Sequence, residues 1–378
     1  MARISRIDNT QKRPQTAPLE ERVKVAEEQD GRSRSQFMGA SQRVDFGLVI
    51  CLTILLAFGM VTLFSASMSA SVSGTGQGTA YIARQALANG LGIGVIFIIT
   101  KFNIKTFDRL EFALILYVFS LLLLGLTYFT APINGAKRWL TVPLFGQFQP
   151  SEFAKVVLVY TLACYFSWLN KQRASGRFMR RRGFKGAYFD TWFDIFLPMC
   201  ITMIPAVITL GQPHFSGMII IVAVGFVCLL AAGIPIRNWF VAIGTGLVLI
   251  LALLFILTIS DPILPQGIKD NFAHVETRLD IFTGNGEASE AAIYQSRQSL
   301  IAMGSGGTFG VGLGQGKQKN NYLPEGHNDY IFSNMVEEIG FVGGMSVLVL
   351  FLIFFILGLR VTFKANSIYA QIVAGGIT

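Results

Sequence analysis

Charged residues are scarce in this 378-residue chain. Asp, Glu, Lys and Arg make up 14% of it, whereas hydrophobic residues make up 52% and the mean hydropathy is +0.53. Soluble domains carry about 25% charged residues, so the composition excludes an ordinary soluble domain. Apolar runs of about 20 residues, enough to cross about 30 Å of hydrocarbon, recur along the sequence. We therefore predict an all-α protein that crosses a membrane several times.

Cysteine is also rare, and its placement excludes a disulfide framework. The four cysteines include no CxxC pair and lie inside apolar runs, so small buried side chains are expected at Cys51, Cys164, Cys200 and Cys228. His214 has no second ligand near it in the sequence, which makes it a poor signal for a metal. The metal content of the protein therefore stays open.

A signal peptide is missing as well. Residues 1–45 are polar, carry charges of both signs and contain no short apolar core before a cleavage site, which predicts a cytoplasmic tail. Eight spans and the start of a ninth are expected after it: 46–66, 80–100, 110–129, 153–168, 194–210, 216–233, 238–259, 335–359 and a segment from about 367.

Basic residues gather in alternate loops between these spans. This pattern predicts a cytoplasmic amino terminus, with even-numbered spans ending inside the cell. The net charge of +9 is then explained by the topology signal and by contact with anionic membrane lipid, without a nucleic-acid partner.

The predicted topology places the stretch "INGAKRWL" outside, just before the fourth span. Lys137 and Arg138 beside Trp139 are typical of interfacial anchors, and a substrate contact is the alternative. The following "QFQPSEFAK" brings Gln149, Ser151, Glu152 and Lys155 to the start of that span.

Pro150 suits the first turn of a helix, and the three-residue spacing lets Glu152 and Lys155 pair on one helix face. A carboxylate at membrane depth is costly unless it is paired or faces a polar cavity, which favours a functional site here.

The loop "GQPHFSG" between the fifth and sixth spans supplies Gln212 and His214. Pro213 breaks the helical run, so a polar turn explains this loop as well as a substrate contact does.

The segment 260–330 is expected to be a large loop on the outer side, and it is the richest in polar motifs. Residues 272–282 have apolar side chains at helical spacing, which predicts an amphipathic helix on the surface. The run "GSGGTFGVGLGQG" lacks the lysine and serine or threonine of a phosphate-binding loop, so a closely packed, turning backbone beneath a substrate groove is expected.

Acidic residues follow this run. Glu325, His327 and Asp329 alternate just before the eighth span, and Glu337 and Glu338 lie one to two turns inside it. Acid pairs so close to hydrocarbon favour binding of a polar headgroup, or of a cation between the headgroup and the protein.

Four motifs in this order resemble the shape, elongation, division and sporulation (SEDS) family, which includes FtsW, RodA and SpoVE. They are "NGAKRWL…QFQPSEFAK", "QPHFSG", "YQSRQSLIAMGSGGTFGVGLGQG" and "YLPEGHNDYIFSNMVEEIGFVGG". The resemblance covers the chain from about residue 45 onward and leans toward the FtsW and SpoVE types. It implies a bundle of ten spans, with a large extracytoplasmic loop between spans seven and eight.

The resemblance also implies an activity. Members polymerise lipid II, the undecaprenyl-diphosphate-linked disaccharide-peptide, into glycan strands outside the cytoplasmic membrane of a bacterium, and they work with a class B penicillin-binding protein. A lipid II flippase and a non-catalytic scaffold for that partner are the alternatives. The charged clusters gather at the outer face rather than deep inside the spans, which favours the enzyme.

Such a reaction needs a carboxylate base for the acceptor hydroxyl and positive charge for the diphosphate leaving group. Arg138, with Lys137 and Lys155, is the expected diphosphate contact, and a divalent cation is the one candidate cofactor. The remaining expected substrate contacts are Gln149, Ser151, Glu152, Gln212, His214, Gln295, Glu325, His327, Asp329 and Glu338.

The chain departs from the family pattern in the outer loop. Relatives carry an essential acidic residue in a "DPxxDPxGxGYQ"-like segment, whereas this chain has "TGNGEASEAAIYQ", which sets Gly284 and Ala288 at the acidic positions. Asp280 and Glu287 are the local substitutes for the base. The chain ends soon after its ninth span begins, so residues 46–378 are expected to be a membrane domain truncated before the last spans.

Overall fold

The structure is a computed structural model in which nine segments are described. They are residues 44–70, 77–102, 106–131, 137–142, 146–178, 183–212, 214–259, 290–318 and 329–378. Residues 1–43, which hold nearly all of the predicted tail, and the predicted amphipathic helix at 272–282 lie outside them.

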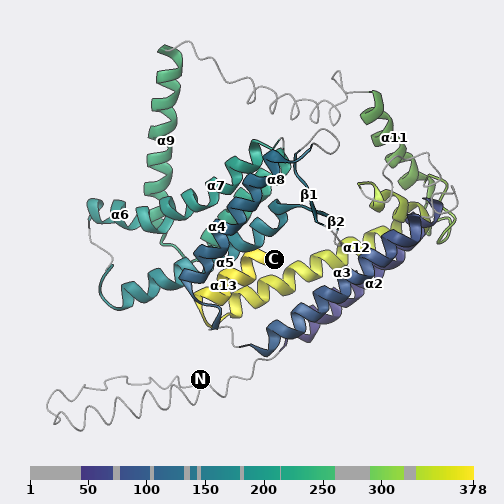
Figure 1. The fold of residues 1–378 in the computed structure, drawn as a ribbon, viewed down its shortest axis with the longest axis horizontal. Helices are drawn as coiled ribbons and strands as arrows, with labels where there is room; N and C mark the ends of the chain where they lie inside the picture. The colour runs from purple at the N-terminus through teal and green to yellow at the C-terminus, as the bar shows by residue number, and fades with distance from the viewer. Residues whose placement is uncertain are drawn as a thin grey trace, which may run out of the picture. The chain divides into compact units, whose positions relative to one another are not determined.

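Helices dominate the described residues, as predicted, and Figure 1 shows their course. The elements that correspond to the first four predicted spans are α2 (Phe46–Ala70), α3 (Gln77–Lys101), α4 (Leu110–Leu126) with the short η3 (Thr127–Phe129), and α5 (Pro150–Ala174). The later ones are α6 (Phe184–Thr191), η4 (Trp192–Phe196), α7 (Leu197–Leu210), α8 (Phe215–Ala231), α9 (Ile236–Ile259), α11 (Glu290–Ser305), α12 (Ile331–Lys364) and α13 (Ile368–Ile377).

Each predicted apolar run coincides with a helix. Six of the described helical segments are long and apolar enough to cross a bilayer, and α8 and α13 are shorter apolar helices. Among the described residues of the predicted loop 260–330 lies a helix that was not expected, α11. The helix α5 also runs further than its predicted span, so that Lys171 and Arg173 fall in its last turn, where cations complement the helix dipole.

A small β-hairpin is the exception to the helical architecture, and the sequence did not predict it. Strand β1 (Leu140–Val142) pairs antiparallel with β2 (Gly146–Phe148), with Leu140 opposite Phe148. The strands are only three residues long, too short for the alternating pattern of apolar and polar residues that identifies strands in a sequence. The hairpin delivers the chain directly to the start of α5.

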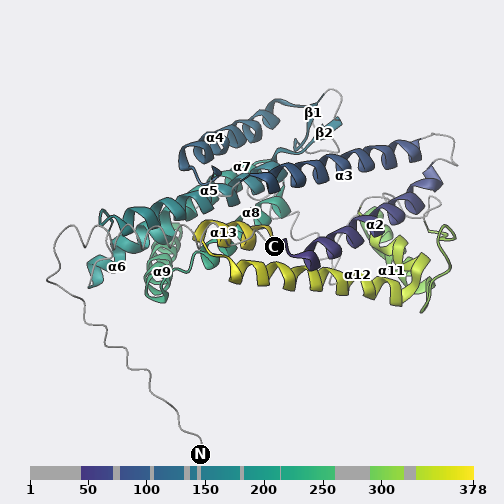
Figure 2. The ribbon, with the colours of Figure 1, turned by 90° about the horizontal axis from the view of Figure 1, so that it is seen from below.

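The core of the described bundle forms around α5. This helix packs against α4, α7, α8 and α13. In its most apolar stretch of 18 residues, 67% of the residues are buried. Leu158 and Leu162 of α5, Ile221 and Leu229 of α8, and Ile372 of α13 are fully buried. Figure 2, like Figure 1, shows α13 beside α5 and α8.

Small residues allow these helices to approach closely. A Cβ at Gly376 would lie 2.7 Å from a methyl carbon of Val159 and 2.8 Å from the sulfur of Cys228. Helices in membranes associate largely through such close packing, because lipid gives little hydrophobic driving force. The ninth predicted span is thus anchored in the core through its glycines.

A proline inside α7 is compensated by a tyrosine from α4. Pro205 has no N–H, so the carbonyl of Ile201, four residues earlier, loses its helical partner. The hydroxyl of Tyr117 donates to this carbonyl at 2.7 Å. The proline is tolerated in the span because a neighbouring helix supplies the missing donor.

Candidate functional site

The residues just before and after the hairpin carry the first group of predicted site residues. Lys137 is exposed, and its Nζ donates to the carbonyl of Tyr128 at 3.3 Å. The Nε of Arg138 and the Oγ of Ser151 are buried, and neither has a hydrogen-bond partner among the described residues. Buried polar atoms without partners are rare in proteins and require an explanation, such as a ligand or an ordered water.

Four of the predicted site residues lie in two pairs at the start of α5. Lys155 Nζ lies 2.7 Å from Glu152 Oε2, which confirms the ion pair predicted from the three-residue spacing. Gln149 Nε2 and His214 Nδ1 lie 3.5 Å apart, so the motifs "QPSEFAK" and "QPHFSG" meet at the start of α5. The glutamate is 59% exposed, which leaves its carboxylate accessible for a ligand.

Gln212 is placed differently from its neighbours. Its side chain is 2% exposed, and Nε2 donates to the carbonyl of Leu124 at 2.9 Å. This bond ties the end of α7 to the end of α4. The substrate contact expected at Gln212 stays a prediction, beside this structural role.

The helix α12 is broken at Gly340, and the glycine-rich turn (residues 306–318) that follows α11 fills the break. Gly340 has φ 75° and ψ −177°, a conformation that glycine adopts readily. A regular helix would bond the two N–H groups after the break to the two carbonyls before it. All four groups bond to the turn instead: the carbonyls of Glu337 and Glu338 accept from the N–H of Val311 and of Gly312, both at 3.0 Å, and the N–H of Phe341 and of Val342 donate to the carbonyls of Gly307 (2.9 Å) and Thr308 (3.1 Å).

Glycines are required where the turn meets the break. A Cβ at Gly310 would lie 2.1 Å from the carbonyl oxygen of Glu338, and one at Gly306 would lie 2.4 Å from that of Val336. A Cβ at Gly340 would lie 2.2 Å from the backbone nitrogen of Gly310. The closely packed, turning backbone predicted for this run is confirmed, and its partner is the broken helix.

The two acidic side chains at the break are buried and bonded. Glu337 is 2% exposed, and its carboxylate accepts the N–H of Lys317 at 2.8 Å and that of Gln318 at 3.2 Å. Glu338 is 4% exposed and accepts the hydroxyl proton of Ser65 from α2. Glu338 also borders a cavity of about 70 Å³ that is otherwise lined mostly by apolar side chains of α2 and α12.

The other predicted site residues lie in the carboxyl-terminal part of the chain. Gln295 is half-buried on α11, and Asp329 is exposed in the turn before α12. Asp280, Glu287, Glu325 and His327 lie outside the described residues. Within the described part of the chain, no three His, Cys, Asp or Glu side chains come together as a metal site.

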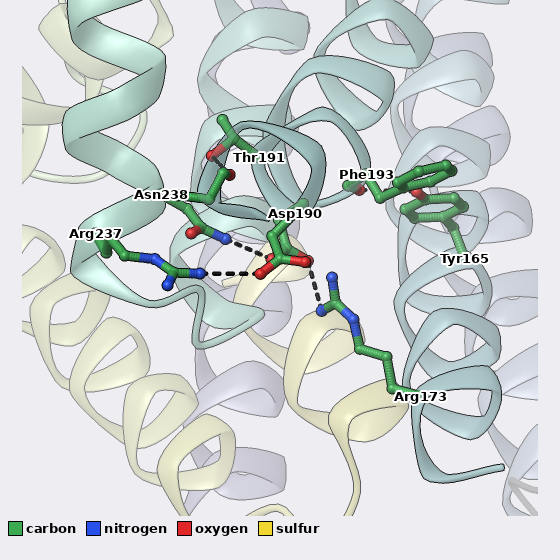
Figure 3. A network of polar contacts seen from close by, with 9 residues as sticks. Tyr165, Arg173, Asp190, Thr191, Phe193, Arg237 and Asn238 are labelled. Carbon is green, nitrogen blue, oxygen red and sulfur yellow. Dashed lines mark hydrogen bonds and ion pairs between the residues drawn. The ribbon is translucent and has the colours of Figure 1, made fainter. Parts of the chain in front are cut away.

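A second polar cluster, which the sequence analysis did not identify, joins α5, α6, η4 and α9. Asp190 and Asp194 are each 2% exposed. Arg237 Nη2 lies 2.9 Å from Asp190, and Arg173 Nη1 lies 2.7 Å from Asp194, which also accepts from Asn238 at 2.7 Å. Figure 3 shows the two arginines reaching the cluster from opposite sides.

Two signals in the sequence could have identified this cluster. Asp190 and Asp194 are four residues apart at the start of an otherwise apolar run, so they share one helix face. Carboxylates in such a run need partners. The partners, Arg173 and Arg237, belong to the basic residues at the inner ends of the predicted spans, which the topology signal alone already explains.

A family model described as "Cell cycle protein", FtsW/RodA/SpoVE, matches residues 46–378. The chain belongs to this family. Among FtsW/RodA/SpoVE relatives, a "Probable peptidoglycan glycosyltransferase FtsW" of Thioalkalivibrio sulfidiphilus is 31% identical, over 82% of this chain and 70% of its own length. The "Stage V sporulation protein E" of Bacillus subtilis is 32% identical, over 88% of this chain and 83% of its own length.

Solved structures agree on the fold. The rod shape determining protein RodA of Thermus thermophilus superposes with a TM-score of 0.54 at 23% identity, covering 89% of this chain and 81% of RodA. A chain from a peptidoglycan synthase complex gives a TM-score of 0.59 at 24% identity, covering 89% of this chain and 83% of that one. Together with the apolar helices, these matches make the chain an all-α membrane protein with the FtsW/RodA/SpoVE fold.

Proposed function

We propose that this chain is a peptidoglycan glycosyltransferase, which polymerises lipid II into glycan strands at the outer face of a bacterial cytoplasmic membrane during division or sporulation. One observation carries the proposal: several relatives that match more than 80% of the chain are named peptidoglycan glycosyltransferase FtsW. The predicted topology, with a cytoplasmic amino terminus, places both the start of α5 and the break in α12 on the outer side.

The start of α5 supports the binding half of this reaction. A lipid-linked diphosphate brings several anionic oxygens, which form strong hydrogen bonds with arginine. The buried and unpartnered Nε of Arg138 is a donor of this kind, and the Oγ of Ser151 is a second buried polar atom without a described partner. The exposed carboxylate of Glu152 and the Gln149 and His214 pair provide polar contacts for the headgroup.

The catalytic base is proposed to be a carboxylate of the outer loop. Asp280, which follows Arg278 on the predicted amphipathic segment, is the first candidate, and Glu287, one residue from the position that the family uses, is the second. A divalent cation at the diphosphate and a class B penicillin-binding protein as partner complete the proposal. A solved chain with a similar fold comes from a peptidoglycan synthase complex, which supports the proposal of a partner.

A polymerisation assay tests the proposal. The purified chain, with and without a class B penicillin-binding protein, should convert fluorescent lipid II into labelled polymer. An Asp280→Ala variant should lose this activity while Glu287→Ala keeps it; the reverse result would transfer the role of base to Glu287. Translocation of lipid II in proteoliposomes without any polymer would contradict the proposal in favour of a flippase.

A scaffold would give a third outcome. In that case Arg138→Ala would leave the partner's crosslinking activity fully stimulated, and neither the wild type nor the variant would form polymer.

A further inference from the structure

The break in α12 lies at the end of the segment that can cross a membrane. Residues 341–359 contain no charged side chain, and at 1.5 Å per residue they extend about 29 Å, the thickness of the hydrocarbon core. Gly340, the break and the bound glycine-rich turn therefore belong at the level of the lipid headgroups. The exposed Phe309 and Leu313 of the turn suit this interface.

Glu337 holds the turn at two points. Its backbone carbonyl accepts from Val311, and its carboxylate accepts from Lys317 and Gln318. Because the side chain is 2% exposed and its carboxylate receives backbone N–H groups, Glu337 is not available to bind a headgroup itself. A Cβ at Gly316 would lie 3.1 Å from the carboxylates of both Glu337 and Glu338, so the turn packs tightly against this pair.

Lys317 is the residue whose place this contact fixes. Its backbone N–H is bonded to Glu337, whereas its side chain is exposed. It is the one cationic side chain in the sequence of the turn. The diphosphate of a lipid-linked sugar lies at the headgroup level, where an exposed ammonium on a bonded backbone can bind it.

We propose that Lys317 binds the diphosphate of the lipid-linked substrate and that Glu337 is the positioning residue which holds Lys317 in place. This inference rests on the proposed function, since it names a further contact for the same substrate. It also gives the buried Glu337 a role distinct from the direct headgroup contacts predicted for its neighbours.

Spin-label mobility tests the positioning role without any need for activity. Cys200 is exposed, contrary to the buried side chain expected there, so it is replaced by Cys200→Ser. A label attached at Gln315→Cys, on the exposed part of the turn, should then be immobilised in the otherwise unchanged protein. Glu337→Gln should increase its mobility, because the amide nitrogen that replaces one carboxylate oxygen cannot accept an N–H group. Ser65→Ala, which removes a hydrogen bond from the neighbouring Glu338 and leaves the bonds of Glu337 in place, is the matched control and should leave the mobility as it was. Equal mobility in all three proteins would overturn the positioning role.

Binding of undecaprenyl diphosphate in nanodiscs tests the role of Lys317. Lys317→Ala should weaken binding about 10-fold, as expected for the loss of a hydrogen bond to a charged group, and Lys317→Arg should restore most of it. Glu337→Gln should weaken binding in the same direction, and the double variant should be no weaker than Lys317→Ala alone, because both act through one contact. Unchanged binding in Lys317→Ala, or additive losses in the double variant, would overturn the inference.

Kinetics separate this inference from the proposed function. If the chain polymerises lipid II, Lys317→Ala should raise KM about 10-fold and change kcat by less than about threefold, the signature of lost ground-state binding. If the wild type forms no polymer while the mobility and binding results hold, the proposed function fails and the diphosphate site remains. If Lys317→Ala forms polymer with an unaltered KM, the proposed function holds and the diphosphate contact at Lys317 is wrong.

Discussion

The two ends of α5 differ in how their polar groups are satisfied. At its last turn, Arg173 binds the buried carboxylate of Asp194, which Asn238 also bonds, although Arg173 Nε and Asn238 Oδ1 have no described partner. At its first turn, Ser151 is buried without a described partner for its Oγ, and Arg138, just before the hairpin, has a buried and unpartnered Nε.

This difference separates a structural cluster from a binding site. Charges that are buried and paired hold helices together, and removing one partner leaves the other uncompensated. Buried polar atoms without a partner occur at both ends. At the first turn they accompany no buried ion pair among the described residues, which fits a site whose partner comes from outside the chain. The end of α5 with the paired charges should therefore govern stability, and the other end should govern substrate binding.

The largest effect is expected at the paired end. Asp194→Ala leaves the partly buried Arg173 without its counter-ion and Asn238 without its acceptor, which should lower the free energy of unfolding by about 3 kcal/mol. The measurement is thermal unfolding of the purified protein in detergent, together with its abundance in membranes. The double variant Arg173→Met with Asp194→Leu should recover most of the loss, since no buried charge remains. A single variant as stable as the wild type would contradict the structural assignment.

The glycine-rich turn gives the next largest effect and contains its own control. Gly310 and Gly314 have similar φ values of 84° and 79°, but only at Gly310 would a Cβ meet a backbone atom, 2.1 Å away. Gly314→Ala should cost about 1–2 kcal/mol for the left-handed conformation alone. Gly310→Ala should cost about 1–3 kcal/mol more, because the turn must move away from α12. Equal losses in thermal unfolding would show that the turn does not pack into the break.

At the unpartnered end the effect should appear in activity. Arg138→Met removes a donor for the diphosphate and should lower kcat/KM for lipid II by about 10- to 100-fold. The exposed Lys137 is the matched control, and Lys137→Met should lower kcat/KM by no more than about fivefold. Polymerisation kinetics with both variants at equal membrane abundance provide the measurement. Equal effects at the two positions would return both to the role of interfacial anchors.

The smallest effect on stability is expected for Glu152→Gln. The ion pair with Lys155 is short, but the glutamate is 59% exposed, so its loss should change the free energy of unfolding by less than about 0.5 kcal/mol. If the carboxylate contacts the headgroup, kcat/KM should still fall about 10-fold. Wild-type kinetics in this variant would make Glu152 a helix-start residue without a role in binding.

The apolar spans could be predicted because each run carries its own signal. A helix of about 20 apolar residues satisfies its backbone internally, so the sequence of the segment alone decides it. The break at Gly340 could not be predicted in this way, because it depends on hydrogen bonds to a turn about 30 residues earlier in the chain. A single glycine in an apolar run looks the same whether the helix bends there or not.

The candidate site was predictable to a similar degree. The pairing of Glu152 with Lys155 follows from spacing within one helix. The approach of Gln149 to His214 and the bond from Ser65 to Glu338 depend on which helices become neighbours, which spacing does not encode. The acidic residues proposed as the base, Asp280 and Glu287, lie outside the described residues and stay predictions.

Tyr117 and Pro205 have a consequence for anyone who transfers segments between related proteins. The tyrosine hydroxyl takes the place of the N–H that the proline lacks, so each residue is suitable only in the presence of the other. A chimera that keeps α7 but replaces α4 with a version that has phenylalanine at this position would bury an unsatisfied carbonyl. The two helices should therefore be exchanged as one unit.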